Sequence, residues 1–193
     1  MARHKTFEKE AVLEKAMDVF WHQGYEATSM QDLVAAMGIN RGSLYDTFKD
    51  KRNLFLSAIA HYNQTVVEQL ISRLMVPGAS RQAIEDHFLN VVEYTVVDSR
   101  HRGCLITNTI VELGAQDPEI AAQTKVNLQR IEDAFFRALL RAQDQREIGQ
   151  DKDLRALSRY FIAAMQGLRV MAKLNPDRSA LQDVVGVILA ALD

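Results

Sequence analysis

Residues 28 to 51 read TSMQDLVAAMGINRGSLYDTFKDK, and this stretch predicts two short helices joined by a tight turn. Apolar side chains in its first part recur with the spacing i, i+3, i+4 and i+7 that buries one face of a helix. These side chains are Met30, Leu33, Val34 and Met37. Gly38 can adopt the left-handed conformation that ends a helix, so we expect the turn directly after Met37.

Hydrogen-bonding side chains stand at the start of each predicted helix. Thr28 and Gln31 have the spacing of a capping box, which satisfies free backbone N–H groups at a helix start. Asn40 is a good N-cap for the second helix. Leu44 and Phe48 lie four residues apart, so both face the core and leave the opposite face of the second helix open.

That open face carries small, basic and hydrogen-bonding side chains. In a helix-turn-helix, the N-terminal residues of the second helix approach base edges in the major groove of DNA. Lys51 opens the following helix, where its ammonium and free N–H groups would attract a phosphate. An ordinary helical hairpin with a solvated polar face would show the same spacing. The residues expected to contact DNA are Thr28, Arg41, Gly42, Ser43, Tyr45, Asp46, Thr47 and Lys51.

The segment resembles the DNA-binding domain of the tetracycline-repressor (TetR) family of bacterial transcriptional regulators. The matching residues tie three helices together: Ala16, Phe20, Gly24, Tyr25, Thr28, Leu33, Ala36, Gly38, Arg41, Gly42, Ser43, Leu44, Tyr45, Phe48, Lys51 and Leu54. Asp46 and Thr47 stand where the family often has His or Asn followed by Tyr. We expect the preference for particular operator bases to reside at these two positions.

The resemblance implies a helix-turn-helix DNA-binding domain over residues 1–52 and a helical effector-binding and dimerisation domain over 53–193. It further implies a repressor that binds a near-palindromic double-stranded operator and is released by a small-molecule inducer. A helix-turn-helix activator, or a regulator that docks another protein without an effector, is the alternative.

The charge of the chain is nearly balanced, with a net charge of −2 over 193 residues. Residues 1–52 contain eight basic and eight acidic side chains, so a general polyanion binder is disfavoured. The basic residues cluster at Arg3-His4-Lys5 and at Lys49 to Arg52, which predicts few phosphate contacts per subunit.

Composition also bounds the location and class of the protein. No stretch approaches the roughly 20 apolar residues that cross a bilayer, so we expect no membrane partner. A single cysteine fits a reducing cytoplasm. None of the five histidines has a Glu three residues before it, and no phosphate-binding glycine loop occurs, so we expect no metal, no cofactor and no catalytic residue.

The rest of the chain predicts an all-α body, giving about nine helices in total. No alternating β pattern competes, and all three prolines fall between periodic segments. The expected helices run over about 52–74, 80–98, 103–115, 117–143 and 153–174, and a last one ends near residue 192.

The last helix predicts a homodimer. Residues 184–192 contain no charged side chain, and a helix that is apolar all round must be covered on more than one side. A second copy of the chain is the economical cover, in agreement with the four-helix dimer interface that the resemblance implies. The expected interface residues are Leu157, Phe161, Ala164, Leu181, Val184, Val185, Ile188 and Leu192.

A small hydrophobic or amphipathic effector is expected among the middle helices, as the resemblance implies. The candidate residues are Phe88, Val92, Tyr94, Thr107, Asn108, Val111, Glu112, Phe161, Met165 and Leu168, although core packing would explain the apolar ones equally well. Arg169 is expected to be a salt-bridge partner rather than an anion ligand. Cys104 follows Arg100, His101 and Arg102, cations that lower a thiol pKa, so a redox switch is an alternative to a buried small hydrophobe.

Overall fold

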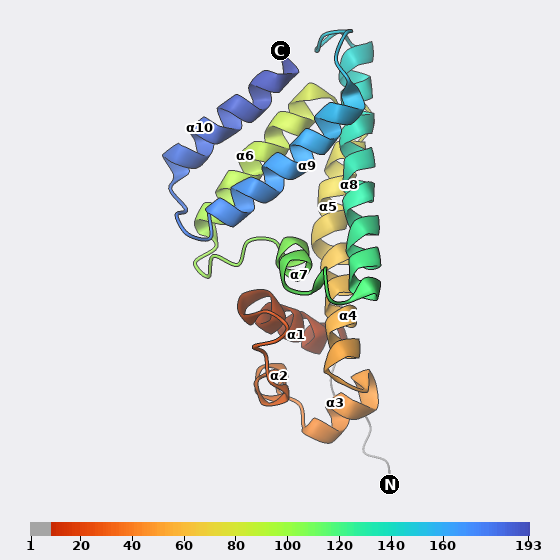
Figure 1. Cartoon of the computed structure of the whole chain (residues 1–193), viewed down its shortest axis with the longest axis vertical. Helices are drawn as coiled ribbons and strands as arrows, with labels where there is room; N and C mark the ends of the chain where they lie inside the picture. Colours follow the sequence, from red (N-terminus) through yellow and green to blue (C-terminus); the bar gives the residue numbers. More distant parts are fainter. Residues whose placement is uncertain (1–8) are drawn as a thin grey trace.

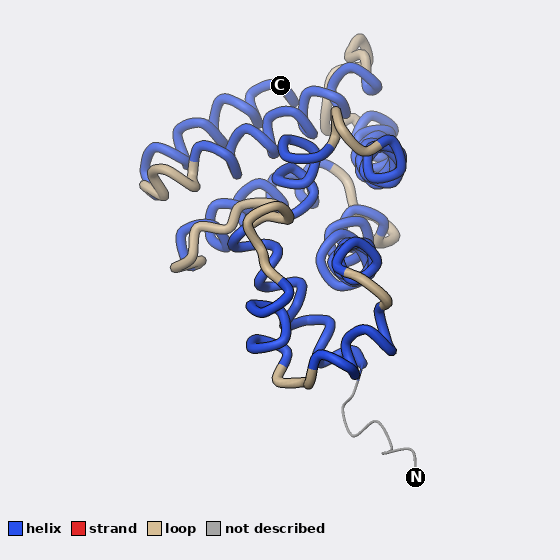
Figure 2. Tube along the Cα trace, turned by 60° about the horizontal axis from the view of Figure 1, so that its bottom comes forward, coloured by secondary structure: helices blue, strands red, loops and turns tan. Residues whose placement is uncertain are grey.

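The computed structural model describes residues 9–193, and this part of the chain is helical without any strand (Figures 1 and 2). The elements are α1 (Lys9–Gln23), α2 (Met30–Met37), α3 (Arg41–Phe48), α4 (Lys51–Tyr62), the π-helical turn η1 (Asn63–Val67), α5 (Glu68–Met75), α6 (Arg81–Val97), α7 (Leu105–Leu113), α8 (Pro118–Asp144), α9 (Leu154–Met171), α10 (Arg178–Leu189) and the 3-10 turn η2 (Ala190–Leu192). Because α4, η1 and α5 form one continuous helix, the all-α prediction of about nine helices is confirmed.

Helices α1 to α3 form a small unit at one end of the molecule, here called the head (residues 9–50; Figure 1). Its core contains Phe20, Leu33 and Leu44, all buried. Helix α1 packs along α4, and the Phe20 and Phe55 rings meet edge to face with centroids 4.9 Å apart. The head is thus anchored on the first turns of the long helix that leads into the rest of the chain.

The turn of the head forms as predicted, but the start of α2 is displaced by one residue. Gly38 has a φ of 68°, and Asn40 accepts a hydrogen bond from the Ser43 N–H at 2.8 Å. Ser29, not Thr28, is the N-cap of α2, and its capping box closes on Asp32. Thr28 instead turns inward and donates to the Gly24 carbonyl at 2.6 Å.

The remaining helices, from α5 to α10, form the body (residues 68–193). Helix α8 runs beside α5 along the long axis, while α6, α9 and α10 lie together across the upper part of the molecule (Figure 1). Three buried aromatic rings from α6, α8 and α9 meet at the centre of the body, with the Phe88 and Phe161 centroids 5.4 Å apart and those of Phe135 and Phe161 5.7 Å apart. Between residues 9 and 193, none of the helices combines the length and apolar content that a membrane crossing requires.

Candidate functional site

The outward face of α3 forms a polar surface at the tip of the head. Leu44 and Phe48 are buried, as predicted, and they fix the rotation of the helix. Arg41 and Tyr45 therefore face solvent, with the guanidinium 5.6 Å from the tyrosine ring centroid and Nη2 3.4 Å from the hydroxyl oxygen. This surface offers a cation, an aromatic ring and hydroxyl groups to a groove of DNA.

Of the residues expected to contact DNA, Gly42 and Asp46 are exposed on the same helix. Ser43 and Thr47 are partly buried, and the Thr47 hydroxyl donates to the Ser43 carbonyl at 2.7 Å. Thr28 is only 1 % exposed and its hydroxyl is already engaged, so assigning it to a DNA contact was wrong.

The two basic residues that open α4, directly after the head, have different roles. Lys51 Nζ lies 4.4 Å from the centroid of the Tyr25 ring and 3.4 Å from the Glu26 carbonyl oxygen. Arg52 binds the body instead, through Asp117 at 2.9 Å and Glu119 at 2.7 Å. Arg52 therefore ties the start of α4 to the body and is not a free phosphate ligand, and the Arg3-His4-Lys5 cluster lies outside the described residues.

Glu112 of α7 binds the head through its backbone. Its carboxylate accepts hydrogen bonds from the N–H groups of Tyr25, at 2.9 Å, and Glu26, at 2.8 Å, directly after α1. Gly24, with a φ of 86°, brings this turn so close that an added Cβ would lie 3.0 Å from the carboxylate. Glu112 is thus part of the junction between head and body rather than a ligand-binding residue, which corrects the sequence prediction.

A second junction links α1 to the segment between α6 and α7. Asp18 pairs with both Arg100 and Arg102. The Arg102 guanidinium also lies 4.3 Å from the centroid of the Trp21 ring and 3.2 Å from the Asp98 carboxylate. These contacts join the segment at 98–103 to the first helix of the head.

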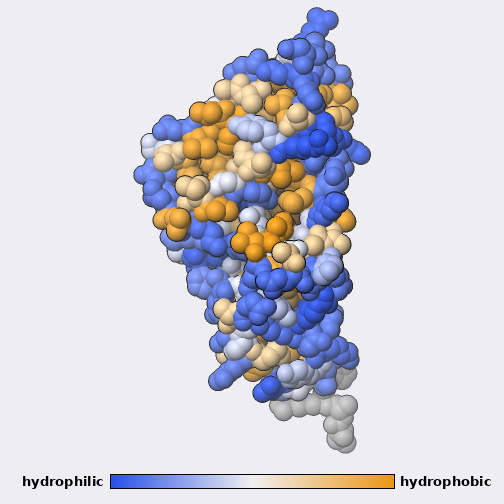
Figure 3. Space-filling view, viewed as in Figure 1, coloured by the Kyte–Doolittle hydropathy of each residue, from blue (hydrophilic) through white to orange (hydrophobic). Residues whose placement is uncertain are grey.

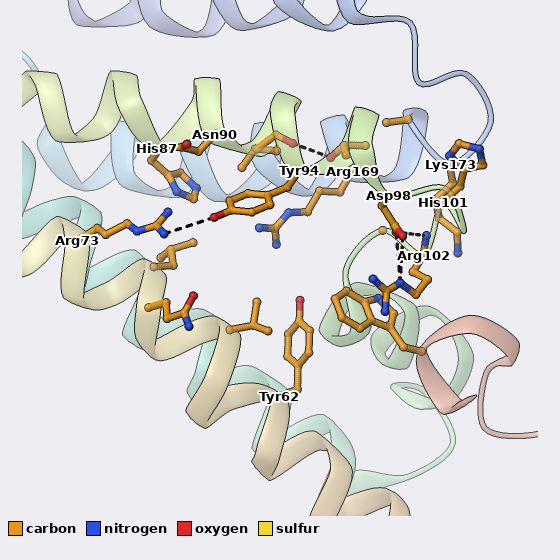
Figure 4. A pocket seen from close by; sticks show the side chains of 18 residues that line it. Tyr62, Arg73, His87, Asn90, Tyr94, Asp98, His101, Arg102, Arg169 and Lys173 are labelled. Atoms are coloured by element: carbon orange, nitrogen blue, oxygen red, sulfur yellow. Dashed lines mark hydrogen bonds and ion pairs between the residues drawn. The ribbon is translucent and has the colours of Figure 1, made fainter. Parts of the chain in front are cut away.

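Beside this junction lies a cavity of about 260 Å³, bounded by α1, the α4–η1–α5 helix, α6, α9 and the segment at 98–103 (Figure 4). Its apolar wall includes Trp21 of the head, Tyr62 of the long helix and Tyr94 of α6. Charged groups also line it, notably Arg73 and Arg169. A ligand in this space would contact the head and the body at once.

The cavity does not lie where the sequence placed it, because among the residues expected to bind an effector only Tyr94 lines it. Five of the other residues expected to bind an effector are buried in the core of the body: Phe88, Val92, Phe161, Met165 and Leu168. Thr107 donates to Gln166, while Asn108 donates to the Arg102 carbonyl at 2.9 Å. Val111 is 82 % exposed to solvent. The prediction followed the apolar stripes of the helices, which mark the sides that face the core. The cavity lies beside those stripes, so the stripes did not locate it.

Four polar side chains that line the cavity were missed or misjudged: Arg73, His87, Arg169 and Lys173. His87 is buried, with Nε2 3.1 Å from the Met165 sulfur, and burial together with two nearby arginines lowers its pKa to about 3. Arg169 was expected to form a salt bridge, but no carboxylate within residues 9–193 lies within 4 Å of its guanidinium. In the sequence, the only sign that Arg169 lines a cavity was its position directly beside the apolar stripe of α9.

Cys104 is buried at the start of α7, where the Tyr62 hydroxyl donates to its sulfur at 3.7 Å. Burial raises the pKa of the thiol, but the positive charge of Arg169 and hydrogen bonding from Thr107 outweigh it, so the pKa of Cys104 is lowered overall. A thiol with a lowered pKa is more readily ionised, although burial restricts access to it.

The predicted dimer-interface residues divide into two groups. Those buried within the single chain are Phe161, Leu181, Val185, Ile188 and Leu192, which keep at most 5 % of their surface exposed and therefore offer little area to a second copy. Leu157 and Ala164 are partly buried, and Val184 is exposed. Apolar side chains gather on the surface over α9, α10 and the segment that joins them (Figure 3), where the exposed large ones are Tyr160, Val170, Met171, Leu174, Val184 and Val187.

Comparison with known proteins agrees with both halves of this architecture. Residues 12–58 match the family described as bacterial regulatory proteins, tetR family, and residues 78–188 match the tetracyclin repressor-like C-terminal domain. The HTH-type transcriptional regulator YezE of Bacillus subtilis (strain 168) is 42 % identical, with all of both chains covered. The HTH-type transcriptional repressor ComR of Escherichia coli (strain K12) is 28 % identical over 97 % of this chain and 90 % of its own.

Solved structures give the same result. A cysteine mutant of the TetR family transcriptional regulator CifR, complexed with 26-base-pair double-strand operator DNA, aligns with a TM-score of 0.88. It is 27 % identical and covers 99 % of this chain and 100 % of its own. These relatives are transcriptional regulators and not enzymes. The chain accordingly belongs to the TetR family of bacterial transcriptional regulators.

Proposed function

We propose that this regulator is a homodimeric cytoplasmic repressor that binds a near-palindromic operator through α3 and is released when an inducer occupies the cavity. The observation that carries the proposal is the composition of the cavity wall. Trp21 belongs to the head, whereas Tyr94 and Arg169 belong to the body. An inducer bound among these residues would contact the head directly and could shift it relative to the body. ComR, a relative over nearly the full chain, is a named repressor.

Dimerisation through α9 and α10 is supported by their outer faces. Val187 is 72 % exposed, and Met171 and Val184 are also exposed. Gly167 and Gly186 have open space where a Cβ would stand, so the backbones of two copies could approach closely there. Covering this apolar surface with the same surface of a second copy gives a two-fold arrangement of four helices.

In such a dimer, two copies of α3 meet successive major grooves about 34 Å apart, so each reads one half-site. Arg41 and Tyr45 face the bases or phosphates of that half-site, and Lys51 contacts its phosphate backbone. The balanced charge of residues 1–52 predicts moderate, selective binding rather than a strong general attraction to DNA.

Induction then follows from a difference in ligand affinity between two positions of the head. We take one position of the two heads to fit the operator and another to be spaced wrongly for it. A ligand that binds the wrongly spaced position more tightly favours that position. Operator affinity then falls by the ratio of the two ligand affinities. The contacts that transmit the movement are Glu112 against the α1–α2 turn and Arg102 against Asp18 and Trp21.

Selection of operators from a random duplex library, followed by mobility shifts with and without a compound panel, tests the proposal. We expect a near-palindromic consensus with half-sites one helical turn apart, and loss of binding with at least one compound. Specific binding that no compound alters would favour an activator or protein-docking regulator. Failure to enrich any sequence would contradict the proposal as a whole.

A further inference from the structure

The charged groups around the cavity are strongly unbalanced. Arg73, Arg169 and Lys173 line it, and none of them has a carboxylate within 4 Å among residues 9–193. Among the described residues that line it, the one acidic side chain is Asp98, which is paired with Arg102 at 3.2 Å. The cavity therefore has an excess of positive charge that the described part of the chain does not neutralise.

Arg169 is the cation best placed to meet a ligand. Its side chain leaves α9 and ends between Tyr94 and Tyr62, inside the space that the lining residues enclose (Figure 4). It is partly buried, and a partly buried guanidinium without a carboxylate partner is costly to maintain. Arg73 approaches the same space from the other side, with its Nη2 3.5 Å from the Tyr94 hydroxyl.

The rest of the cavity lining is mostly apolar and indicates the character of the part of a ligand that lies away from Arg169. Val66, Leu70, Val91 and Ala172 provide apolar surface beside the aromatic rings. The indole ring of Trp21 adds aromatic surface, and its buried N–H has no hydrogen-bond acceptor in residues 9–193. A neutral His87 adds no positive charge of its own.

From this combination we infer that the natural effector is an amphipathic organic anion, a carboxylate with an apolar body, whose carboxylate is bound by Arg169 and whose body lies against Trp21, Tyr62 and the aliphatic wall. The inference rests on the proposed function, since it names the class of inducer for the same cavity. A cationic compound would be repelled by the unpaired cations, and a neutral compound would leave the Arg169 guanidinium without a counter-charge. A guanidinium accepts a carboxylate in a planar, two-pronged geometry.

The chain supplies its own probe for this test, because Trp21 is the only tryptophan in the sequence and it lines the cavity. Its fluorescence in the full-length protein, without DNA, is titrated with hexanoate, octanoate and decanoate. The alcohol and the primary amine of each chain length are titrated in parallel. We expect saturable fluorescence changes with the carboxylates, with affinities about 10-fold to 100-fold above those of the matching alcohols, as a hydrogen-bonded charge pair provides.

Three arginine variants locate the charge. Arg169→Met should lower carboxylate affinity about 10-fold to 100-fold and leave alcohol affinity within about twofold. Arg169→Lys keeps the charge and should retain most of the preference, and it covers the case in which Arg169→Met fails to fold. Arg159→Met is the matched control, because Arg159 lies on the same helix, does not line the cavity and is mostly exposed.

Equal or tighter binding of the alcohols or amines, no binding of any of the carboxylates, or an unchanged preference in Arg169→Met would overturn the inference. Operator affinity measured on the same samples distinguishes a failure of this inference from a failure of the proposed function. Carboxylates that bind with the expected preference but leave operator affinity unchanged would support the ligand class while contradicting the inducer role.

Discussion

The junction at Glu112 makes the head–body contact measurable with one conservative change. Glu112→Gln keeps the shape of the side chain but replaces one carboxylate oxygen with an NH2 group that faces a backbone N–H. Of the bonds to Tyr25 and Glu26, at 2.9 and 2.8 Å, one is lost and the other loses its charge. A hydrogen bond to a charged group contributes about 1.5–3 kcal/mol to the free energy of unfolding. Because the Glu112 carboxylate is partly exposed, we take the lower end of this range.

A loss of about 1.5 kcal/mol in a chain of this size lowers the Tm by about 3–6 °C, at about 2–4 °C per kcal/mol. Calorimetry or circular dichroism measures this change. The inducer-driven fall in operator affinity should also shrink, since α7 would no longer follow the head. DNA-binding anisotropy of a labelled operator, with and without inducer, measures that second effect.

Glu147→Gln is the control for both readouts. Its carboxylate also accepts a backbone hydrogen bond, from the Arg81 N–H at 3.1 Å, but it lies in the body away from the head. We expect a smaller change in Tm and an unaltered inducer response. An unchanged Tm and response in Glu112→Gln, or equal effects in both variants, would refute a head–body coupling through Glu112.

Four further changes test separate parts of the account. Tyr45→Ala should weaken operator binding about 10-fold, by the 1–3 kcal/mol typical of a base-reading contact, while gel filtration and circular dichroism stay unchanged; equal affinity would remove Tyr45 from the contact surface. Val187→Glu should shift the protein to a monomer in analytical ultracentrifugation, whereas Val76→Glu, at another exposed valine, should not; a dimeric Val187→Glu would place the interface elsewhere. Burial lowers the pKa of His87 from 6.5 to about 3, so the unfolded chain binds a proton below pH 6.5 that the folded chain does not. Stability should therefore fall by about 2 kcal/mol from pH 7 to pH 5 in urea unfolding, and His87→Gln should lack this part of the fall. Cys104→Ser should keep the response to inducer because the thiol is buried against Tyr62, and loss of the response would favour a redox switch.

Local signals explain what could be predicted from the sequence. Gly38 and Asn40 determine the turn of the head because each acts through its own backbone or its nearest neighbours. The start of α2 was placed one residue early because Thr28 and Ser29 are both good caps. Only the burial of Thr28 against the Gly24 carbonyl decides between them.

The cavity and the dimer surface depend on information that a helical stripe does not contain. Val185 and Val184 are adjacent in an apolar helix, yet one is buried and the other exposed, and periodicity alone does not say which face the chain itself covers. The cavity collects single residues from distant elements, such as Trp21 and Arg169, which only the packing of head on body brings together.

The operator affinity of the dimer with its cavity saturated tests the central claim most directly. Trp21 fluorescence establishes saturation by a carboxylate ligand, and anisotropy of a labelled operator gives the Kd in the same solution. We predict that the Kd increases at least fivefold, within the range of about 5–150-fold for coupled sites. An unchanged Kd with the cavity fully occupied would contradict it.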